Sequence, residues 1–318
     1  MTNIFSSISR QFNNITATYG KYTPWGKVLT FIVLLLILIM SFKEIRSNVG
    51  EGFEQNDKFL FKSGPDIFDD FYVEIYDYLV FNNLKDDYEI GEILNKTSPS
   101  SQSKVLDIGS GTGHHVADLS SRGVDVIGID NSEAMVKQAK KNYPDYKFEI
   151  GDVTLSDQFA SQTFTHILCM YFTIYYIQDK QVFFQNCYNW LMPGGYLVVH
   201  LVDRVNFDPI LPPGNPLLLV SPQKYADKRI TSTQIKFTDF AYNANFELDE
   251  QNNIAKFVEK FKNDNDGKVR KQEHIMYMPD LNEIIDEAQG AGFIIQGKID
   301  LIHCQYEYQY LYIFTKPN

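Results

Sequence analysis

Val105-Leu106-Asp107-Ile108-Gly109-Ser110-Gly111-Thr112-Gly113 is the stretch that decides the fold of this chain. Its apolar start predicts a buried strand, and its glycines predict a tight turn into a helix, because glycine adopts backbone angles that other residues avoid. The next apolar run, 126–129, ends at Asp130, where a carboxylate can bind the two hydroxyls of a ribose. The pattern therefore predicts a nucleoside-containing ligand at the ends of two neighbouring strands.

The spacing of the glycines separates the classes of nucleotide site. Dinucleotide-binding folds use G-x-G-x-x-G, but the third position is His114 here, and no Gly-Lys-Ser/Thr of a phosphate-binding loop follows. Asp107 would repel a pyrophosphate and attract an ammonium group. A cofactor with a ribose, a cationic amino-acid end and no phosphate is S-adenosylmethionine. A tight turn without a ligand is the alternative that this motif alone leaves open.

The motif D-I-G-S-G-T-G resembles motif I of the class I S-adenosylmethionine-dependent methyltransferases. Four later segments resemble the family in the same order: the third-strand motif at 148–153, the fourth strand at 165–170, the L-x-P-G-G turn and fifth strand at 191–199, and the late helix with Ala-Gly-Phe at 280–293. The resemblance runs from near Asp66 to the C-terminus. It implies an α/β fold with a Rossmann-like seven-stranded sheet and helices on both faces.

The resemblance also implies a set of cofactor-binding residues. Asp152 stands where the family's third-strand aspartate receives the adenine amino group. A helix expected within 66–79 resembles the helix that covers the cofactor in many of these enzymes, although simple packing of an amphipathic helix is an equally open interpretation. The expected cofactor-binding residues are Asp107, Gly109, Gly111, Gly113, Asp130, Asn131, Asp152, Val153, Met170 and Tyr72.

Hydrophobic periodicity supports this architecture independently of the resemblance. Strands are expected at 104–108, 124–129, 146–150, 164–170 and 196–202, and helices at 113–122, 132–142 and 179–191. Alternating strands and helices predict a parallel sheet that binds its ligand at the carboxyl ends of the strands. A final helix at 280–290 and strands near 293–302 and 306–315 match the family's closing hairpin.

Residues 204–277 interrupt this alternation. Several segments between 235 and 277 alternate with period two, which predicts an inserted antiparallel sheet after the strand at 196–202. Such insertions resemble those that shape the acceptor pocket in small-molecule N- and O-methyltransferases, so we expect a substrate lid. A structural or oligomerising flap is the alternative.

A base is required if the methyl acceptor is a protonated amine or a hydroxyl. The candidates at the expected edge of the sheet are His200, Tyr171, Asp203 and His274. His200 can equally be a core histidine, and the aromatic run 171–176 can be either core packing or a cage for a cationic amine. His114 and His115 are expected to line the cofactor edge or cap a helix, and no metal site is predicted.

Bulk composition restricts the possible partners. The formal charge of −11 argues against a nucleic-acid partner, because neutralising phosphates requires a basic face. The three cysteines are far apart in the sequence and form no disulfide or zinc spacing. The Asn/Asp-Pro-Pro-aromatic motif of methyltransferases that act on amide or exocyclic amino nitrogens is absent, since that place reads Met170-Tyr171-Phe172-Thr173.

The segment 28–42 is uncharged and almost wholly apolar, with Lys27 and Lys43 at its ends. It predicts a single-pass transmembrane anchor, because no small-x-small cleavage site follows and no polar face exists at helical spacing. The expected organisation is a tail at 1–27, the anchor at 28–42, a linker at 43–64 and a methyltransferase domain at 65–318. The basic residues flanking the anchor are nearly balanced, and the need for S-adenosylmethionine favours a cytosolic domain.

Together these features predict a membrane-anchored, S-adenosylmethionine-dependent methyltransferase. The expected acceptor is an N or O atom of a small molecule or lipid head group. Two alternatives stay open: a protein or peptide acceptor, and a non-catalytic membrane-anchored module that keeps the fold. The intact acidic and glycine residues of the cofactor motifs favour an enzyme.

Overall fold

The computed structural model of the chain describes residues 23–27, 59–214, 223 and 226–318. The chain divides into two compact units, 1–56 and 57–318. In the first unit, the described residues 24–27 form one helical turn. The expected membrane anchor at 28–42 lies outside the described residues. No helix among the residues that are described is long and apolar enough to cross a membrane.

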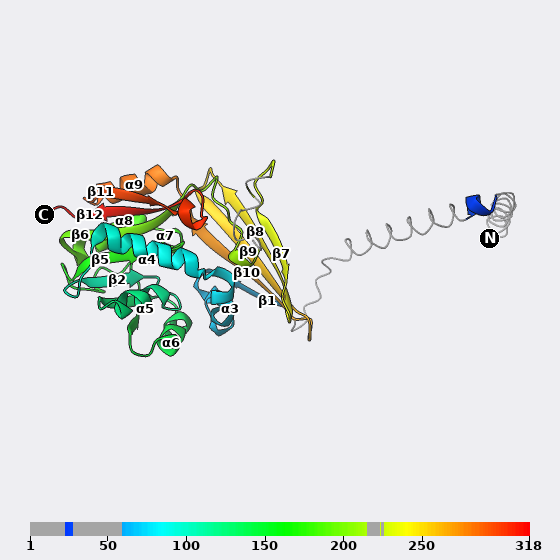
Figure 1. Ribbon diagram of the computed structural model, residues 1–318, viewed down its shortest axis with the longest axis horizontal. Coiled ribbons are helices and arrows are strands. Elements are labelled where there is room, and N and C mark those ends of the chain that lie inside the picture. The colour runs from blue at the N-terminus through cyan, green and yellow to red at the C-terminus, as the bar shows by residue number, and fades with distance from the viewer. Residues whose placement is uncertain (1–22, 28–58, 215–222, 224–225) are drawn as a thin grey trace. The chain divides into compact units, whose positions relative to one another are not determined.

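A seven-stranded mixed sheet, of order β11-β12-β6-β5-β2-β3-β4, forms the centre of the second unit (Figure 1). β12 (Gln309–Thr315) runs antiparallel to both of its neighbours, whereas the strands from β6 to β4 are parallel to one another. The α/β class predicted from the sequence is confirmed. The remaining strands are β2 (Lys104–Ile108), β3 (Asp125–Asp130), β4 (Lys147–Ile150), β5 (Phe164–Cys169), β6 (Leu191–Val202) and β11 (Ile294–Asp300).

Helices pack on both faces of this sheet because its central strands are apolar on both sides. Leu106 of β2 and Ile167 of β5 belong to the core that also contains residues of α8 and α9. Their neighbours Val105 and Leu168 point to the opposite core, which contains residues of α4, α5 and α6. These helices are α4 (Asn83–Thr97), α5 (His114–Ser121), α6 (Glu133–Asn142), α8 (Lys180–Trp190) and α9 (Leu281–Gly290).

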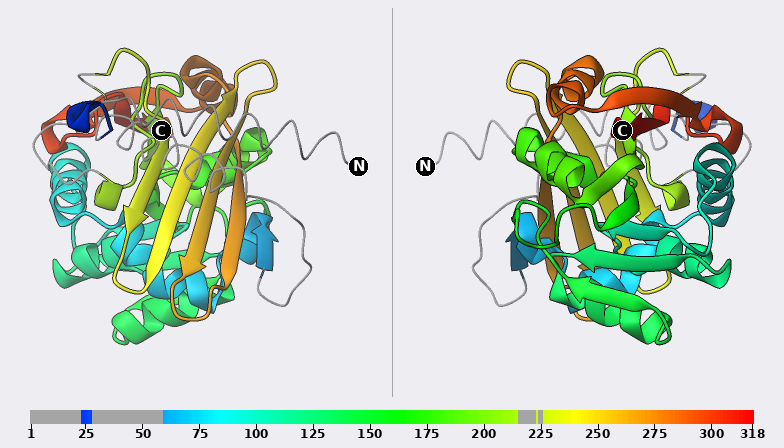
Figure 2. Two further views of the ribbon diagram at one scale, coloured as in Figure 1. Left: turned by 90° about the vertical axis from the view of Figure 1, so that its right-hand side faces the viewer. Right: turned by 90° about the vertical axis from the view of Figure 1, so that its left-hand side faces the viewer.

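A second, five-stranded sheet has the order β1-β10-β9-β8-β7, and Figure 2 shows one of its faces in the left view. Its antiparallel strands β7 (Ser232–Lys236), β8 (Phe240–Asp249), β9 (Ile254–Asn263) and β10 (Val269–Tyr277) fall inside the expected insertion. β1 (Phe59–Ser63) pairs in parallel with β10, although the sequence placed these residues in the linker. The apolar run Phe59-Leu60-Phe61 suits an edge strand, and the backbone of β10 supplies its partner.

The segment before the central sheet differs from a single helix at 66–79. It contains a short 3-10 helix, η1 (Gly64–Ile67), and then α3 (Asp70–Val80). The helix begins at Asp70 because the extended Asp69 caps it, accepting a hydrogen bond of 3.2 Å from the backbone N–H of Tyr72. The cap therefore fixes the point from which Tyr72 and later residues of α3 project.

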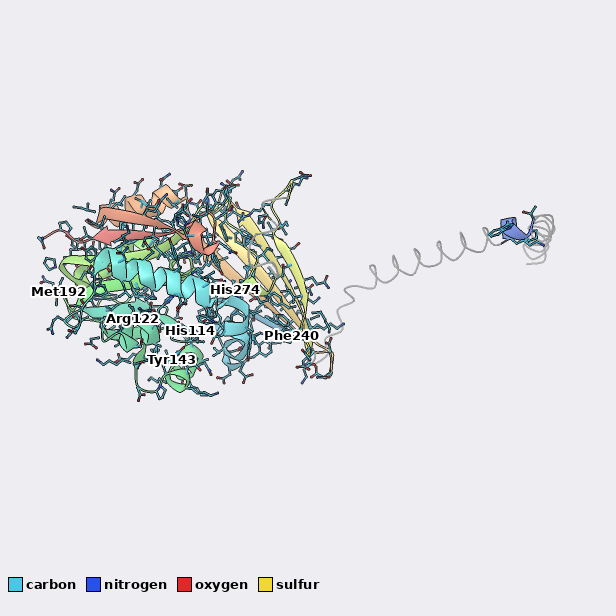
Figure 3. The ribbon with its side chains drawn as sticks, in the orientation of Figure 1. His114, Arg122, Tyr143, Met192, Phe240 and His274 are labelled. Carbon is cyan, nitrogen blue, oxygen red and sulfur yellow. The ribbon has the colours of Figure 1, made fainter. Side chains whose placement is uncertain are left out.

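His114 and His115 hold α3 and α4 against the helix that follows the glycine turn. His114 Nε2 lies 3.2 Å from the Asp77 carboxylate of α3, and His114 Nδ1 is hydrogen-bonded at 2.9 Å to the Tyr143 hydroxyl (Figure 3). His115 Nε2 lies 2.9 Å from the Asp86 carboxylate of α4. Neither histidine lines the cavity described below. They act as links between helices.

Candidate functional site

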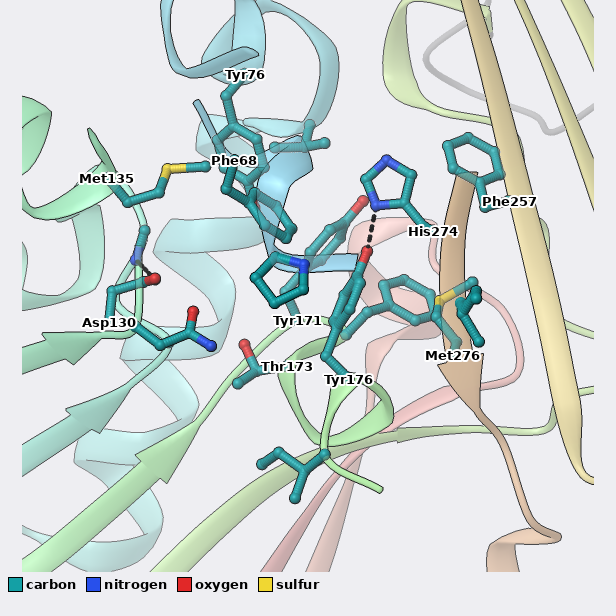
Figure 4. A pocket seen from close by; sticks show the side chains of 18 of the residues that line it. Phe68, Tyr76, Asp130, Met135, Tyr171, Thr173, Tyr176, Phe257, His274 and Met276 are labelled. Carbon is teal, nitrogen blue, oxygen red and sulfur yellow. Dashed lines mark hydrogen bonds between the residues drawn. The ribbon is translucent and has the colours of Figure 1, made fainter. Parts of the chain in front are cut away.

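One cavity of about 470 Å³ lies between the carboxyl ends of the parallel strands, η1 and α3, and the five-stranded sheet. Figure 4 shows its two ends, with Asp130 and Met135 on one side and Tyr176, His274 and Phe257 on the other. We call the first end the cofactor edge, formed by Gly109, Gly111, Asp130 and Asp152. We call the second end the acceptor wall: Tyr176, Phe257 and His274 line the cavity there, and the buried Glu259 lies behind His274.

The glycine turn brings backbone, rather than side chains, to the cofactor edge. Gly109 and Gly111 have φ angles of +69° and +53°, a region that residues with a Cβ rarely adopt. A Cβ on Gly109 would lie 2.5 Å from both Thr173 Oγ1 and Cγ2. No side chain therefore fits at position 109, and because glycine has none, a ligand can approach the main chain of the turn.

Asp130 stands at the end of β3 with its carboxylate held by two backbone donors. Oδ2 accepts a hydrogen bond of 3.0 Å from Gly111 N–H, and Oδ1 accepts one of 2.9 Å from Ser132 N–H. Burial raises the pKa of Asp130, and these backbone bonds oppose the rise. Each oxygen keeps a lone pair, and the residue lines the cavity, so the carboxylate can accept the two hydroxyls of a ribose.

Asp107 is almost completely buried, and neither carboxyl oxygen has a hydrogen-bond partner among the described residues. Burial raises its pKa to about 7, although the nearby His115 opposes the rise. A buried carboxylate without a partner is costly, and an incoming ammonium group would relieve that cost. These residues fit S-adenosylmethionine: Asp107 would face its amino group, and Asp130 its ribose.

The other expected cofactor-binding residues divide into two groups. Lining the cavity, besides Gly109, Gly111 and Asp130, are Tyr72, Asn131, Asp152 and Val153. Asp152 Oδ1 already accepts bonds from the backbone and hydroxyl of Thr154, at 2.9 and 2.7 Å. Three expected residues do not line the cavity, and they are Asp107, Gly113 and Met170.

Aromatic side chains dominate the rest of the lining. None of the described lining residues is lysine or arginine, and the carboxylates among them are Asp130, Asp152 and Asp208. Aromatic faces attract cations, and phosphate groups are usually bound by arginine or lysine. The aromatic faces and carboxylates of this chamber therefore suit a cationic group. Its aromatic residues are Phe68, Tyr72, Tyr76, Tyr171, Phe172, Tyr176, Phe207, Phe246, Phe257, Tyr277 and Tyr306.

Two of the four candidate bases line the cavity, Tyr171 and His274, and two do not. His200 is fully buried; its Nδ1 is bonded to the Tyr171 carbonyl and its Nε2 lies 3.0 Å from Gln309 Oε1. Burial, together with the Lys85 charge, lowers the pKa of His200 to about 4. The structure thus gives His200 a supporting role: it holds the backbone of Tyr171, whose φ of +51° is strained.

Asp203 forms a turn rather than a wall of the cavity. Its Oδ1 accepts backbone bonds from Val205 and Asn206 at 3.1 and 3.2 Å, and its Oδ2 accepts the Asn206 side chain at 2.8 Å. Aspartate commonly organises turns in this way. Asp203 directly follows the strand that ends at Val202, and this sequence position alone did not reveal that its carboxylate organises a turn.

Sequence reasoning missed the polar residues behind His274. Glu259 and Gln272 are fully buried, and Arg270 is nearly so. Arg270 donates to Gln272 Oε1 at 2.8 Å and to the α3-capping residue Asp69 at 2.8 Å. The sequence did contain a signal for them, because alternation with period two places Arg270, Gln272 and His274 on one face of β10. In the structure, that face is the buried one.

Comparisons with known proteins agree with this geometry. A family described as "Methyltransferase domain" matches residues 105–195. The chain is 34% identical over 115 residues to phosphoethanolamine N-methyltransferase 1 of Triticum aestivum, covering 34% of this chain and 22% of that protein. It is 30% identical over 114 residues to the dTDP-4-amino-2,3,4,6-tetradeoxy-D-glucose N,N-dimethyltransferase of Saccharopolyspora spinosa, covering 35% of this chain and 45% of that protein.

A solved structure extends the likeness of fold beyond the matched segment. The CcbJ methyltransferase of Streptomyces caelestis superposes with a TM-score of 0.61 at 15% identity, covering 79% of this chain and 98% of that one. The chain spans less than half the length of the two curated relatives that it matches. Residues 105–195 therefore match a methyltransferase-domain family, and the chain shares the fold of a solved methyltransferase.

Proposed function

We propose that the chain transfers a methyl group from S-adenosylmethionine to an amine nitrogen of a small molecule that carries no phosphate. The observation that carries this proposal is the continuity of the cavity from the cofactor edge into an aromatic chamber with acidic residues and one histidine. When bound, the cofactor supplies a methyl group that is already activated by the sulfonium. The work of the protein is then to position the acceptor and exclude water.

The two curated relatives support nitrogen as the acceptor atom, since both are named as N-methyltransferases. The wheat relative is named for a phosphorylated amine, and the described lining of this chain offers no lysine or arginine for a phosphate. An amine without a phosphate fits this lining better than a phosphorylated amine does. For the same reason, a small phosphate-free molecule fits it better than a phospholipid head group. A protein acceptor finds less support because the chamber lies between two sheets and α3.

The experiment uses the full-length chain in detergent and S-adenosylmethionine labelled in the methyl group. Acceptors of similar size carry an amine, a hydroxyl, a carboxylate, or an amine with a phosphate, as in phosphoethanolamine. We expect label in the amines without phosphate, and none in any acceptor for Asp130→Ala. Preferred labelling of phosphoethanolamine or a hydroxyl would contradict the proposal. Calorimetry that finds no S-adenosylmethionine binding by the folded chain would instead favour a non-catalytic module.

We also propose that the segment 28–42 anchors the enzyme in a membrane with the methyltransferase domain in the cytosol. The support is its uncharged, apolar sequence between Lys27 and Lys43. Carbonate extraction of membranes should retain the full chain and release a variant with Leu34→Arg and Leu36→Arg. Release of both proteins would contradict anchoring, and protection of the domain from added protease in spheroplasts or intact microsomes would show which side it occupies.

A further inference from the structure

A chain of hydrogen bonds leads from the cavity into the closed interior of the five-stranded sheet. The Tyr176 hydroxyl of α7 (Thr173–Tyr176) is bonded at 2.8 Å to His274 Nδ1 of β10 (Figure 4). His274 Nε2 is bonded at 2.7 Å to Glu259 Oε2 of β9. The exposed fraction falls along the chain, from 38% for Tyr176 to 2% for His274 and 0% for Glu259. Tyr176 and His274 both line the cavity, Tyr176 is the more exposed of the two, and Glu259 does not line it.

The partners of Glu259 fix where the protons lie. Besides His274, its carboxylate accepts bonds of 2.6 Å from the Tyr242 hydroxyl and from Gln272 Nε2. Burial alone would raise the pKa of Glu259, but the hydrogen bond and charge of His274, followed by the Tyr242 and Gln272 donors, lower it. A carboxylate has no proton to give, so His274 Nε2 must carry the proton of that bond. In the neutral imidazole, Nδ1 is then a lone pair that accepts the Tyr176 O–H.

We propose that Tyr176, His274 and Glu259 form a relay that removes a proton from an ammonium group in the cavity. This inference rests on the proposed amine acceptor. Tyr176 is the catalytic residue that touches the acceptor, His274 takes the proton through it, and Glu259 is a positioning residue. The arrangement follows the logic of a nucleophile–histidine–carboxylate triad, in which an acid fixes the tautomer of a histidine.

The ammonium proton moves to the Tyr176 oxygen while the Tyr176 proton moves to His274 Nδ1, leaving an imidazolium beside the Glu259 carboxylate. The nitrogen lone pair that is freed forms the new bond to the methyl carbon, and the electron pair of the broken carbon–sulfur bond stays on sulfur. The imidazolium afterwards returns its proton to solvent through Tyr176. No group outside the proposed reaction is required.

The surroundings of His274 favour this role. Phe68, which follows η1, Tyr72 of α3 and Phe257 of β9 pack around its ring at centroid distances of 5.9, 5.7 and 5.8 Å. Glu259 is the charged group in contact with it, while Arg270 reaches the network only through Gln272. The imidazolium that the proton transfer creates lies directly beside this carboxylate.

The same hydrogen bonds could serve only to join β10 to α7, and two measurements separate these roles. The first is ¹⁵N NMR of histidine side chains in the full chain at pH 8, with His274→Gln used for assignment. We expect a neutral His274 with its proton on Nε2, and a changed Nδ1 shift in Tyr176→Phe. A proton on Nδ1, or a doubly protonated ring, would overturn the relay whether or not any acceptor is turned over.

The second measurement compares two acceptors of equal ring size at pH 7: cyclohexylamine, which is protonated, and aniline, which is neutral. Tyr176→Phe, His274→Gln and Glu259→Gln should each lower kcat for cyclohexylamine by about 100-fold, in the range typical of general bases. They should lower kcat for aniline by less than about threefold, because aniline needs no deprotonation before attack. The affinity for S-adenosylmethionine should stay unchanged.

Glu247→Gln is the matched control, because it removes a carboxylate from an exposed position on β8 of the same sheet. It should leave both rates unchanged. Equal losses for both acceptors in the three relay variants would show a structural role and overturn the proposal. If the wild-type chain methylates neither amine, the amine acceptor of the proposed function fails, while the NMR result still decides the relay.

Discussion

The cofactor edge and the acceptor wall serve one cavity but are built differently. The cofactor edge uses backbone groups, glycine and carboxylates that directly follow parallel strands. The acceptor wall uses side chains from α7, β9 and β10, whose hydrogen bonds join residues as far apart as Tyr176 and His274. The first depends on local backbone geometry and the second on packing between distant segments. Substitutions should therefore separate cofactor binding from acceptor turnover.

The largest effect should come from Gly109→Ala. The new Cβ would sit 2.5 Å from the Thr173 side chain, and the φ of +69° would strain any residue with a Cβ. Because Thr173 is short, the backbone must move, and the cofactor edge would lose its shape. We expect no S-adenosylmethionine binding detectable by calorimetry.

Gly91→Ala is the matched control for that change. Gly91 lies within α4, and nothing lies within 4 Å of a Cβ placed there. Alanine should stabilise the helix by about 0.5–1 kcal/mol and leave cofactor affinity unchanged. Wild-type affinity in Gly109→Ala would show that the cofactor edge does not depend on this backbone shape.

Asp130→Ala should weaken S-adenosylmethionine binding by about 100-fold, because hydrogen bonds to a charged group contribute about 1.5–3 kcal/mol each. The variant also leaves the N–H groups of Gly111 and Ser132 without their acceptor. Titration calorimetry measures the dissociation constant. Asp125→Ala, at the other end of β3 in an exposed ion pair with Lys147, should leave it unchanged. If the two substitutions weakened binding equally, the proposed contact between Asp130 and the ribose would be contradicted.

Asp107 should make cofactor binding depend on pH. Its pKa of about 7 means that the ligand-free carboxyl is largely protonated below pH 7, whereas the cationic amino group of the cofactor requires the ionised form. Affinity should fall as pH is lowered from 7 to 5.5, with a limiting slope of about tenfold per pH unit. His115 stays charged across this range: burial disfavours its charge, but Asp86 and Glu89 raise its pKa well above the usual value.

Asp107→Asn should bind more weakly at pH 7 and lose this pH dependence. The same raised pKa affects folding, since the folded chain holds a proton that the unfolded chain releases. Wild-type stability relative to Asp107→Asn should therefore be fully present below about pH 4 and decline as pH rises to 7. If calorimetry gave the same pH dependence of cofactor affinity for both proteins, a contact between Asp107 and the cofactor would be contradicted. If thermal unfolding gave the same pH dependence of stability for both, the raised pKa of Asp107 would be contradicted.

The two regions also differ in how far the sequence predicted them. Asp107 and Asp130 lie at the carboxyl ends of β2 and β3, and Gly109 directly follows β2, so their meeting at one edge follows from parallel pairing alone. The acceptor wall depends on antiparallel register, which places Gln272 opposite Glu259 and His274 opposite Phe257. That register is set by packing across about 15 residues of chain and cannot be read from any single strand.

The second reason why the acceptor wall could not be predicted from the sequence is that its polar residues lie on a buried face. Polar residues of a strand usually lie on its exposed face, yet Arg270, Gln272 and His274 lie on the buried face of β10. They are stable there because each has a partner: Asp69, Glu259 or Tyr176. His200 shows the converse: of the two interpretations left open for it, a base or a core histidine, its burial and two bonded ring nitrogens favour the core histidine, which supports Tyr171.

The smallest effect should come from Phe257→Leu, which changes the acceptor wall while preserving apolar volume. If the ring attracts a cationic acceptor, its loss should raise KM by about fivefold, corresponding to about 1 kcal/mol for a cation–π contact. The dissociation constant for S-adenosylmethionine should stay unchanged because Asp130 lies at the opposite end of the cavity (Figure 4).

Phe240→Leu is the control on the same sheet, at a position that does not line the cavity (Figure 3). It should alter neither KM nor the cofactor affinity. An increase in KM for a protonated acceptor but not for a neutral one would assign the Phe257 effect to the ring's attraction for charge. An equal increase for both would mean that Phe257 contributes shape alone, and the acceptor wall would then discriminate amines only through Tyr176 and His274.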